Sequence, residues 1–96
     1  MNEVRLRRAI AQACRAIHAR GWVANHDGNV SARVAPGRIV CTPTAVSKGA
    51  IDEDLLIVVD GEGRLLAGRL KPFGEINLHL AVYAARADVQ AVLHAH

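Results

Sequence analysis

The sequence predicts an α/β domain in which two helices accompany a set of short strands joined by tight turns. Three observations indicate this class. Apolar residues recur at three- and four-residue intervals over 2–19, as they do in amphipathic helices, and Pro72 and Gly74 precede a second predicted helix over 75–85. Short runs rich in β-branched residues lie between turns that contain glycine or proline. The 96 residues suffice for one small domain with a modest core.

The first predicted helix runs from Asn2 to Ala19 and ends before Gly21, a residue type that commonly stops helices. Its apolar stripe consists of Val4, Ala9, Ile10, Ala13, Cys14 and Ile17. Arginines share the same segment, and we interpret them as a solvated helix face rather than as an anion-binding patch. They are Arg5, Arg7, Arg8, Arg15 and Arg20.

Five strands are predicted, and turn residues separate most of them. They cover residues 30–34, 38–41, 55–59, 64–66 and 89–96. In the first of them, apolar residues alternate with Ser31 and Arg33, which is typical of a half-buried strand. Pro36-Gly37 and Asp60-Gly61-Glu62-Gly63 are turn signals, so each favours an antiparallel hairpin between its neighbouring strands.

The second predicted helix covers 75–85 and precedes the last strand. Glu75 stands at its first turn, where the helix dipole favours a negative charge. The side expected to face the core consists of Ile76, Leu78, Leu80, Val82 and Tyr83.

Composition argues against several classes of partner. Aromatic residues make up only 3%, too few to build a stacking surface for single-stranded nucleic acid, although the net charge is +3. There is no signal-peptide pattern and no apolar run long enough to span a membrane. Cys14 and Cys41 lack metal-type spacing and are expected to be reduced, buried thiols. We therefore expect a cytoplasmic protein with no nucleic-acid partner and no membrane partner.

The segment 42–49 is dense in hydroxyls and small residues. Such a loop can offer hydroxyls and backbone N–H groups to an anion, with Lys48 nearby. An ordinary connection, in which serine or aspartate caps a short turn, explains the local sequence equally well. Both interpretations stay open on the loop alone.

The end of the chain carries a possible metal site. His94 and His96 project to the same side of a strand, because successive side chains alternate between its faces. Two neutral imidazoles can grip one divalent cation, and Glu75 could approach from the helix start. His-x-His is a weak signal by itself, since histidines near a chain end are often just exposed.

Several of these segments together resemble the class II aldolase/adducin family. They are Gly28-Asn29-Val30-Ser31-Ala32-Arg33, Thr42-Pro43-Thr44, Asp60-Gly61, Lys71-Pro72 with Glu75, Leu78-His79-Leu80-Ala81-Val82-Tyr83 and His94-Ala95-His96. The family's order and spacing are kept from the first helix to the chain end. The resemblance implies a three-layer α/β/α sandwich on a central, mainly antiparallel sheet. It also implies metal-dependent cleavage or rearrangement of sugar phosphates, as in fuculose-phosphate aldolase and ribulose-phosphate epimerase.

The resemblance assigns roles to individual residues. His94 and His96 match two of the family's three zinc-binding histidines, so the expected cofactor is Zn²⁺ or another divalent metal. Glu75 matches the glutamate that acts as acid/base and can also approach the metal. Substrate-binding positions are expected at Gly28, Asn29, Thr44, Ala45 and Gly74. His79 matches a helix histidine that is not a ligand.

The chain departs from the family in three places. The third histidine ligand comes from a later part of family members. Residues 1–96 are therefore expected to form a class II aldolase/adducin-like domain incomplete at its C-terminus, with an unusually short homologue as the alternative. Phe73-Gly74 stands where the aldolases commonly have two serines, which puts a phosphorylated substrate in doubt. Ala45 replaces a frequent glycine. The resemblance also implies a homo-oligomer, a ring tetramer with sites at subunit interfaces.

Two functions follow as hypotheses. The first is a metal-dependent aldolase-type lyase that cleaves a small sugar or sugar phosphate by a retro-aldol reaction through a metal-stabilised enediolate. Epimerisation or decarboxylation on the same metal platform remains open. The second is a non-catalytic, adducin-like interaction module.

Overall fold

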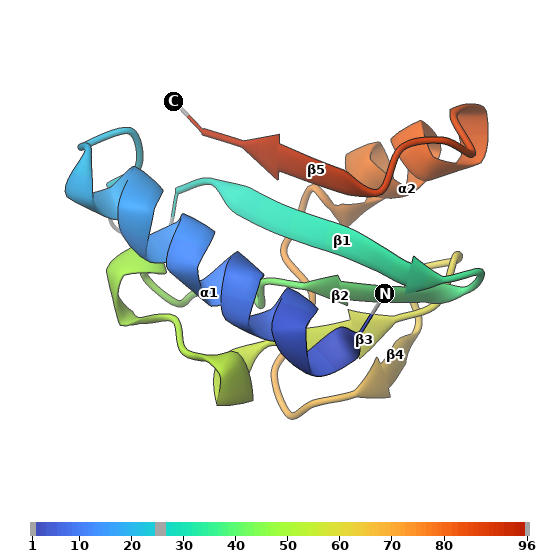
Figure 1. Ribbon diagram of the computed structural model, residues 1–96, viewed down its shortest axis with the longest axis horizontal. Coiled ribbons are helices and arrows are strands. Elements are labelled where there is room, and N and C mark those ends of the chain that lie inside the picture. Colours follow the sequence, from blue (N-terminus) through green and yellow to red (C-terminus); the bar gives the residue numbers. More distant parts are fainter. Residues whose placement is uncertain (1, 25–26, 96) are drawn as a thin grey trace.

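The computed structural model describes residues 2–24 and 27–95, and these form a five-stranded sheet with two α-helices and two short 3₁₀ helices (Figure 1). In chain order the elements are α1 (Glu3–Ala19), β1 (Asn29–Ala35), β2 (Arg38–Cys41), η1 (Lys48–Ala50), η2 (Glu53–Leu55), β3 (Ile57–Val59), β4 (Leu65–Ala67), α2 (Ile76–Ala85) and β5 (Ala91–His94). The strand predicted over 55–59 begins only at Ile57. The preceding residues form η2 because Asp52 Oδ1 accepts hydrogen bonds from the N–H groups of Asp54 and Leu55.

All strand pairs are antiparallel, in the order β4-β3-β2-β1-β5. Strands β1 to β4 follow one another as neighbours, and α2 then returns the chain so that β5 lies beside β1 (Figure 1). The register places Asn29 opposite His94 and Ser31 opposite Val92. The first residues of β1 therefore meet the last described residues of β5 at one end of the sheet.

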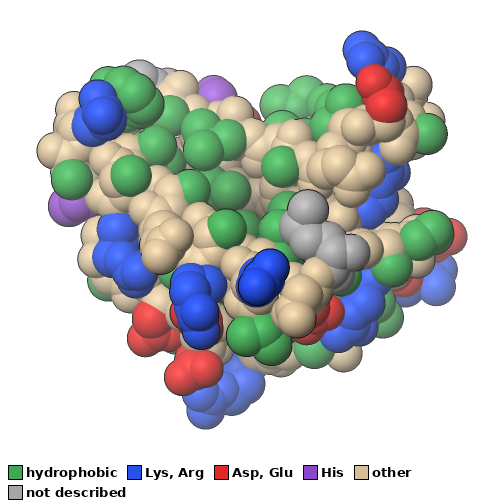
Figure 2. Space-filling model, viewed as in Figure 1, with side chains coloured by type: hydrophobic (Ala, Val, Ile, Leu, Met, Phe, Trp, Pro, Cys, Tyr) green, Lys and Arg blue, Asp and Glu red, His purple; other side chains and the backbone are tan. Residues whose placement is uncertain are grey.

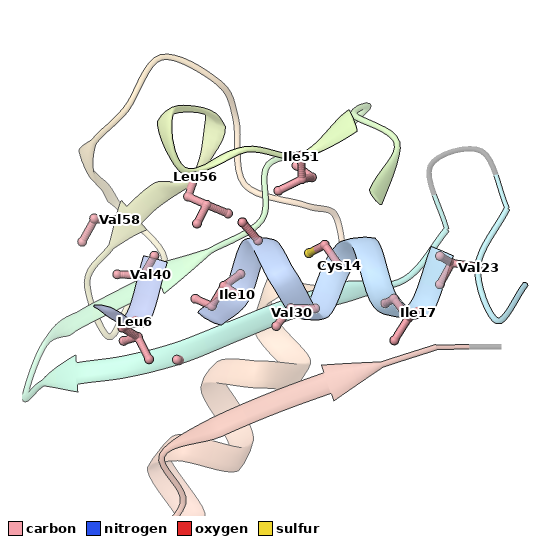
Figure 3. Close-up of a cluster of buried hydrophobic side chains, with 12 residues drawn as sticks. Leu6, Ile10, Cys14, Ile17, Val23, Val30, Val40, Ile51, Leu56 and Val58 are labelled. Carbon is pink, nitrogen blue, oxygen red and sulfur yellow. The ribbon is translucent and has the colours of Figure 1, made fainter. Parts of the chain in front are cut away.

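Helix α1 packs an apolar stripe against one face of the sheet. It begins at Asn2, whose Oδ1 accepts hydrogen bonds from the N–H groups of Val4 at 2.9 Å and Arg5 at 3.3 Å. The cluster beneath it consists of Leu6, Ile10, Ala11, Cys14, Ile17, Val23, Val30, Ala32, Val40, Ile51, Leu56 and Val58 (Figure 3). The predicted stripe was wrong at Val4 and Ala9, which are exposed because the buried face is centred on Leu6, Ile10 and Cys14.

The arginines of α1 lie largely in solvent, as predicted, and several of them form ion pairs or hydrogen bonds. Arg7 Nε lies 3.3 Å from Glu3 Oε2, and Arg8 Nε lies 3.3 Å from Glu53 Oε1. Arg15 donates to the backbone carbonyl of Ile51 at 3.1 Å. Figure 2 shows basic side chains interspersed with acidic ones on this face rather than gathered in one patch.

Helix α2 packs on the opposite face, against strand residues that alternate with those under α1. This second cluster consists of Ile39, Cys41, Ile57, Val59, Phe73, Leu80 and Tyr83. Ser31, on the same face of β1, is 0% exposed, so the prediction of a half-buried first strand was wrong. Its polar side is covered by α2 rather than by water. The prediction for α2 also failed at Leu78, which is 56% exposed.

Arg33 fixes the end of α2 and the turn into β5. Its guanidinium donates to the backbone carbonyls of Tyr83 at 3.1 Å, Ala87 at 2.9 Å and Val89 at 2.7 Å. It also stacks over the Tyr83 ring at 4.9 Å. A side chain predicted to face solvent therefore satisfies carbonyls that the helix end leaves unpaired, and this sets the direction from which β5 approaches β1.

Candidate functional site

A cavity of about 280 Å³ opens where the chain enters β1, leaves β2 and begins α2. Three segments line it, 27–29, 43–45 with Lys48, and 73–75. All of the predicted substrate-binding residues, and Glu75, are among the lining residues. They are Gly28, Asn29, Thr44, Ala45 and Gly74. The fold therefore gathers residues from three distant segments into one concave site, the usual form of a small-molecule site.

Gly28 sits where a side chain would collide with its surroundings. Its φ is +80°, and a Cβ placed on it would lie 2.6 Å from Val23 Cγ1 and 3.0 Å from the His94 carbonyl oxygen. Both the left-handed backbone and the lack of space require glycine here. The backbone at the start of β1 therefore packs closely against the end of β5.

Asn29 lines the cavity and also belongs to a buried series of hydrogen bonds. Its Oδ1 lies 2.5 Å from His79 Nε2, and Ser31 Oγ lies 2.6 Å from His79 Nδ1. Ser31 Oγ also lies 2.7 Å from the Tyr83 hydroxyl. The helix histidine thus joins two polar residues of β1, and we call the group Asn29, Ser31, His79 and Tyr83 the polar chain.

The direction of the polar chain follows from the charge of His79. Burial lowers the pKa of His79 to about 4, so the imidazole is neutral at pH 7 and has one donor and one acceptor nitrogen. With Asn29 Oδ1 facing Nε2, Nε2 carries the proton and Nδ1 accepts from Ser31. The Asn29 oxygen is then occupied, which leaves its NH₂ group as the part of the amide able to donate to a ligand. His79 is 0% exposed, and its expected lack of a ligand role stays a prediction.

The loop after β2 is tied to the loop before α2. Pro43 and Pro72 form an isolated antiparallel bridge, and the Thr44 N–H donates to the Lys71 carbonyl at 2.9 Å. Ala45 follows with φ +62°, a left-handed conformation that favours glycine. The residue that replaces the frequent glycine therefore keeps the glycine-type backbone, and this strain lies in the cavity wall.

Phe73 and Gly74 occupy the place of the expected serines in different ways. The Phe73 side chain is buried and packs its ring on that of His79, with centroids 4.7 Å apart and planes at 65°. A Cβ added to Gly74 would meet no atom within 4 Å. The first residue is thus committed to the core, whereas the second leaves open space beside the cavity.

Glu75 and His94 meet at the edge of the cavity. Glu75 precedes the first turn of α2, and its side chain makes no capping hydrogen bond within the described residues. Its Oε2 lies 3.5 Å from His94 Nδ1. His94 reaches this position because it ends β5 directly opposite Asn29.

These two side chains suit a divalent metal in part. A carboxylate and an imidazole are donors that zinc accepts. Within residues 2–24 and 27–95, no three His, Cys, Asp or Glu side chains form a group that could hold a metal. The predicted ligand His96 lies outside the described residues. Glu75 and His94 are therefore the two members of the predicted ligand set that lie among the described residues, and their role as ligands stays a prediction.

Lys48 is a cavity residue whose burial the sequence did not indicate. It begins η1, lines the cavity and is 2% exposed. Burial lowers the pKa of its ammonium group. The only hint in the sequence was its place in the loop 42–49, and burial of a lysine there does not follow from local pattern.

Comparison with known proteins decides the family. A family model described as "Class II Aldolase and Adducin N-terminal domain" matches residues 8–96. The chain belongs to this family. The resemblance drawn from the motifs is confirmed, and the five-stranded antiparallel sheet with two helices matches solved class II aldolase structures.

Relatives in the family extend beyond the matched region. The chain is 35% identical over 96 residues to 5-methylthioribulose-1-phosphate/5-deoxyribulose-1-phosphate aldolase of Escherichia coli O45:K1 (strain S88 / ExPEC), covering 100% of the chain and 44% of that protein. It is 41% identical over 87 residues to methylthioribulose-1-phosphate dehydratase of Methylococcus capsulatus (strain ATCC 33009 / NCIMB 11132 / Bath), covering 91% and 42%. The crystal structure of YgbL from Klebsiella pneumoniae matches with a TM-score of 0.93 at 31% identity, covering 100% and 46%. The chain thus spans less than half the length of these relatives.

None of the helices in the described part of the chain is both long and apolar enough to cross a membrane.

Proposed function

We propose that the protein is a metal-dependent, aldolase-type lyase that cleaves a small sugar or sugar phosphate, and that this chain supplies the substrate cavity and part of the metal site. One observation carries the proposal: the predicted substrate residues and Glu75 line a single cavity, and His94 lies 3.5 Å from Glu75 at its edge. The chain's membership of the class II aldolase family supports it. The printed name of the Escherichia coli relative supports the reaction class.

Glu75 is the proposed acid/base. Its carboxylate is exposed, is not used in capping α2 within the described residues, and stands beside the cavity, so it can reach a substrate proton. In the cleavage direction it takes the proton from the substrate hydroxyl whose carbon leaves as an aldehyde, and it returns a proton to the carbon left behind. A divalent metal, held by His94 and His96 with Glu75, would supply Lewis-acid polarisation of the substrate carbonyl.

The remaining cavity residues are proposed to hold the anionic end of the substrate. Asn29 offers its amide NH₂, because its oxygen is bound to His79. Thr44 offers a hydroxyl. Gly28, Ala45 and Gly74 allow the backbone to approach closely, since Gly28 and Gly74 carry no side chain and Ala45 carries only a methyl group.

The same proposal extends to the whole protein. We propose a cytoplasmic homo-oligomer, a tetramer by family resemblance, in which residues 1–96 belong to a larger three-layer α/β/α domain. The metal is proposed to be zinc.

The names of relatives support a second candidate reaction on the same site. One is a methylthioribulose-1-phosphate dehydratase, and another, from Haemophilus influenzae, is a 3-oxo-tetronate 4-phosphate decarboxylase. Dehydration also needs a base beside the substrate carbonyl, a task that suits Glu75. The products separate the candidates: cleavage gives two carbonyl compounds, dehydration gives one compound and water, and decarboxylation gives CO₂.

Zinc content and turnover test the proposal. We expect near-stoichiometric zinc by elemental analysis, lost in His94→Ala and kept in His18→Ala, which removes an exposed histidine that does not line the cavity. With 5-deoxyribulose 1-phosphate as a trial substrate, Glu75→Gln is expected to lower turnover by about 10²-fold or more. Glu62→Gln, in an exposed turn, leaves it unchanged. Folded protein without zinc, or turnover that survives Glu75→Gln, would contradict the proposal.

A further inference from the structure

Lys48 is the one Lys, Arg, Asp or Glu side chain that is buried among the described residues. It is 2% exposed and lines the cavity. Desolvating an ammonium group is costly unless the charge is compensated. This unfavourable burial occurs in the wall of the cavity.

The surroundings of Lys48 leave its charge largely uncompensated. Within the described part of the chain, no carboxylate oxygen lies within 4.0 Å of Nζ. Its ammonium donates a long hydrogen bond, 3.5 Å, to the Val46 carbonyl, although an ammonium has three donors. The neighbouring Cys14 is a neutral thiol at pH 7, because burial raises its pKa to about 11. Asp27, which also lines the cavity, attracts the ammonium only from a distance.

The donors on the cavity wall point to the chemistry that would compensate this charge. Lys48 brings the two N–H donors of its ammonium that have no hydrogen-bond partner among the described residues, Asn29 brings an amide NH₂, and Thr44 brings a hydroxyl. All three residues line the same cavity. A tetrahedral oxyanion has several acceptor oxygens and can bond to donors that converge from different directions. A neutral hydroxyl would not compensate a buried cation.

We infer that Lys48 supplies the cation that binds the anionic end of the substrate, an end already proposed to contact Asn29 and Thr44, and that this anion is a phosphate monoester. This inference rests on the proposed function only in taking the cavity as the substrate site. It makes Lys48 a specificity-determining residue, because a substrate without the anion would leave the ammonium buried and unpaired.

Phosphate titration of the purified chain, without added metal, tests this inference. Inorganic phosphate is the probe, and binding is followed by melting temperature and by the amide NMR signals of Gly28 and Thr44. Wild type is expected to bind and to show shifts at these amides. Lys48→Met should weaken phosphate binding by about tenfold or more, because a charge-assisted hydrogen bond is lost. Lys71→Met is the matched control, since it removes the exposed second lysine of the chain and should leave the affinity unchanged.

A second variant keeps the test decisive if Lys48→Met folds poorly. Asp27→Asn removes the carboxylate that competes for Lys48 and repels an anion, so phosphate should bind more tightly. Acetate is the comparison ligand, and equal responses to acetate and phosphate would overturn the assignment to a phosphate ester. Wild type that shows no phosphate response, or a Lys48→Met variant that titrates like wild type, would overturn the inference.

The two proposals fail separately. Phosphate binding is measured without metal or turnover, so a protein that lacks zinc and lyase activity could still bind phosphate through Lys48. Conversely, the protein could bind zinc and show turnover that depends on Glu75, while its phosphate affinity is the same in wild type and in Lys48→Met.

Discussion

Strand β1 presents different kinds of side chain to α1 and to α2, although the other strands present apolar side chains to both helices. Facing α1, the strands present Val30, Ala32, Val40 and Val58, all apolar. Facing α2, β1 presents Asn29 and Ser31, which are buried and hydrogen-bonded to His79. Apolar packing is non-directional and tolerates small adjustments, whereas a hydrogen-bonded chain fixes one orientation. The α1 face supplies stability, and the α2 face orients Asn29 at the cavity.

Ile10→Ala should have the largest effect, and on stability alone. Ile10 is buried in the cluster under α1, where truncation to alanine costs about 2–5 kcal/mol of unfolding free energy. Urea unfolding, followed by the fluorescence of the single tryptophan, Trp22, measures the loss. Because Ile10 does not line the cavity, phosphate affinity of the folded fraction should not change. A loss below about 1 kcal/mol, or a changed affinity, would break the comparison.

His79→Leu should change how the stability of the protein depends on pH, because His79 of α2 is buried. The folded-state pKa of His79 is about 4, below the ordinary value of 6.5, so the unfolded chain binds this proton first as pH falls. The contribution of neutral His79 to the free energy of unfolding is fully present above pH 6.5. It decreases by about 3 kcal/mol as the pH falls towards 4.

The variant should lose that share of the pH dependence. At pH 7 it should also be less stable than wild type, since Asn29 Oδ1 and the Ser31 hydroxyl lose their partner. Denaturant unfolding at a series of pH values measures both effects, and His18→Leu, at an exposed position, is the control. An unchanged pH profile in His79→Leu would contradict the neutral, buried histidine.

Ala45→Gly should have the smallest effect, and in the opposite direction. Its φ of +62° is unfavourable for alanine, so glycine relieves strain and should raise stability by up to about 1 kcal/mol. Ala84→Gly is the control, because Ala84 is exposed within α2 and glycine there should destabilise. Thermal unfolding compares the two. A destabilised Ala45→Gly would show that the methyl group makes a contact worth more than the strain.

The sequence predicted elements well where one local pattern decides them. The strand Arg38–Cys41 was predicted to the residue, and both helices to within one or two residues. It failed where tertiary contacts decide. Ser31 and Arg33 carry the polar alternation of a solvated strand, yet α2 buries one and takes hydrogen bonds from the other. Nothing local to β1 shows that a helix fifty residues later covers it.

The site residues likewise include some that the sequence predicted and one, Lys48, whose burial it did not. Motif order brought Gly28, Asn29, Thr44, Ala45, Gly74 and Glu75 together in the prediction, and the fold gathers them in one cavity. Lys48 was noticed only as a neighbour of the loop, because its burial depends on how η1 packs beside α1. The roles of all these residues in binding and catalysis stay predictions.

The pairing of β5 with β1 has a kinetic consequence. Strands β1 to β4 pair with neighbours in the sequence, whereas the Asn29–His94 pair joins the first and last strands of the chain and closes a much longer loop. The Asn29–His79 bond spans 50 residues as well. Both contacts sit at the cavity, so a molecule that binds there has completed its longest-range pairings. A phosphate or zinc titration would therefore also count the fraction of molecules that have reached the native state.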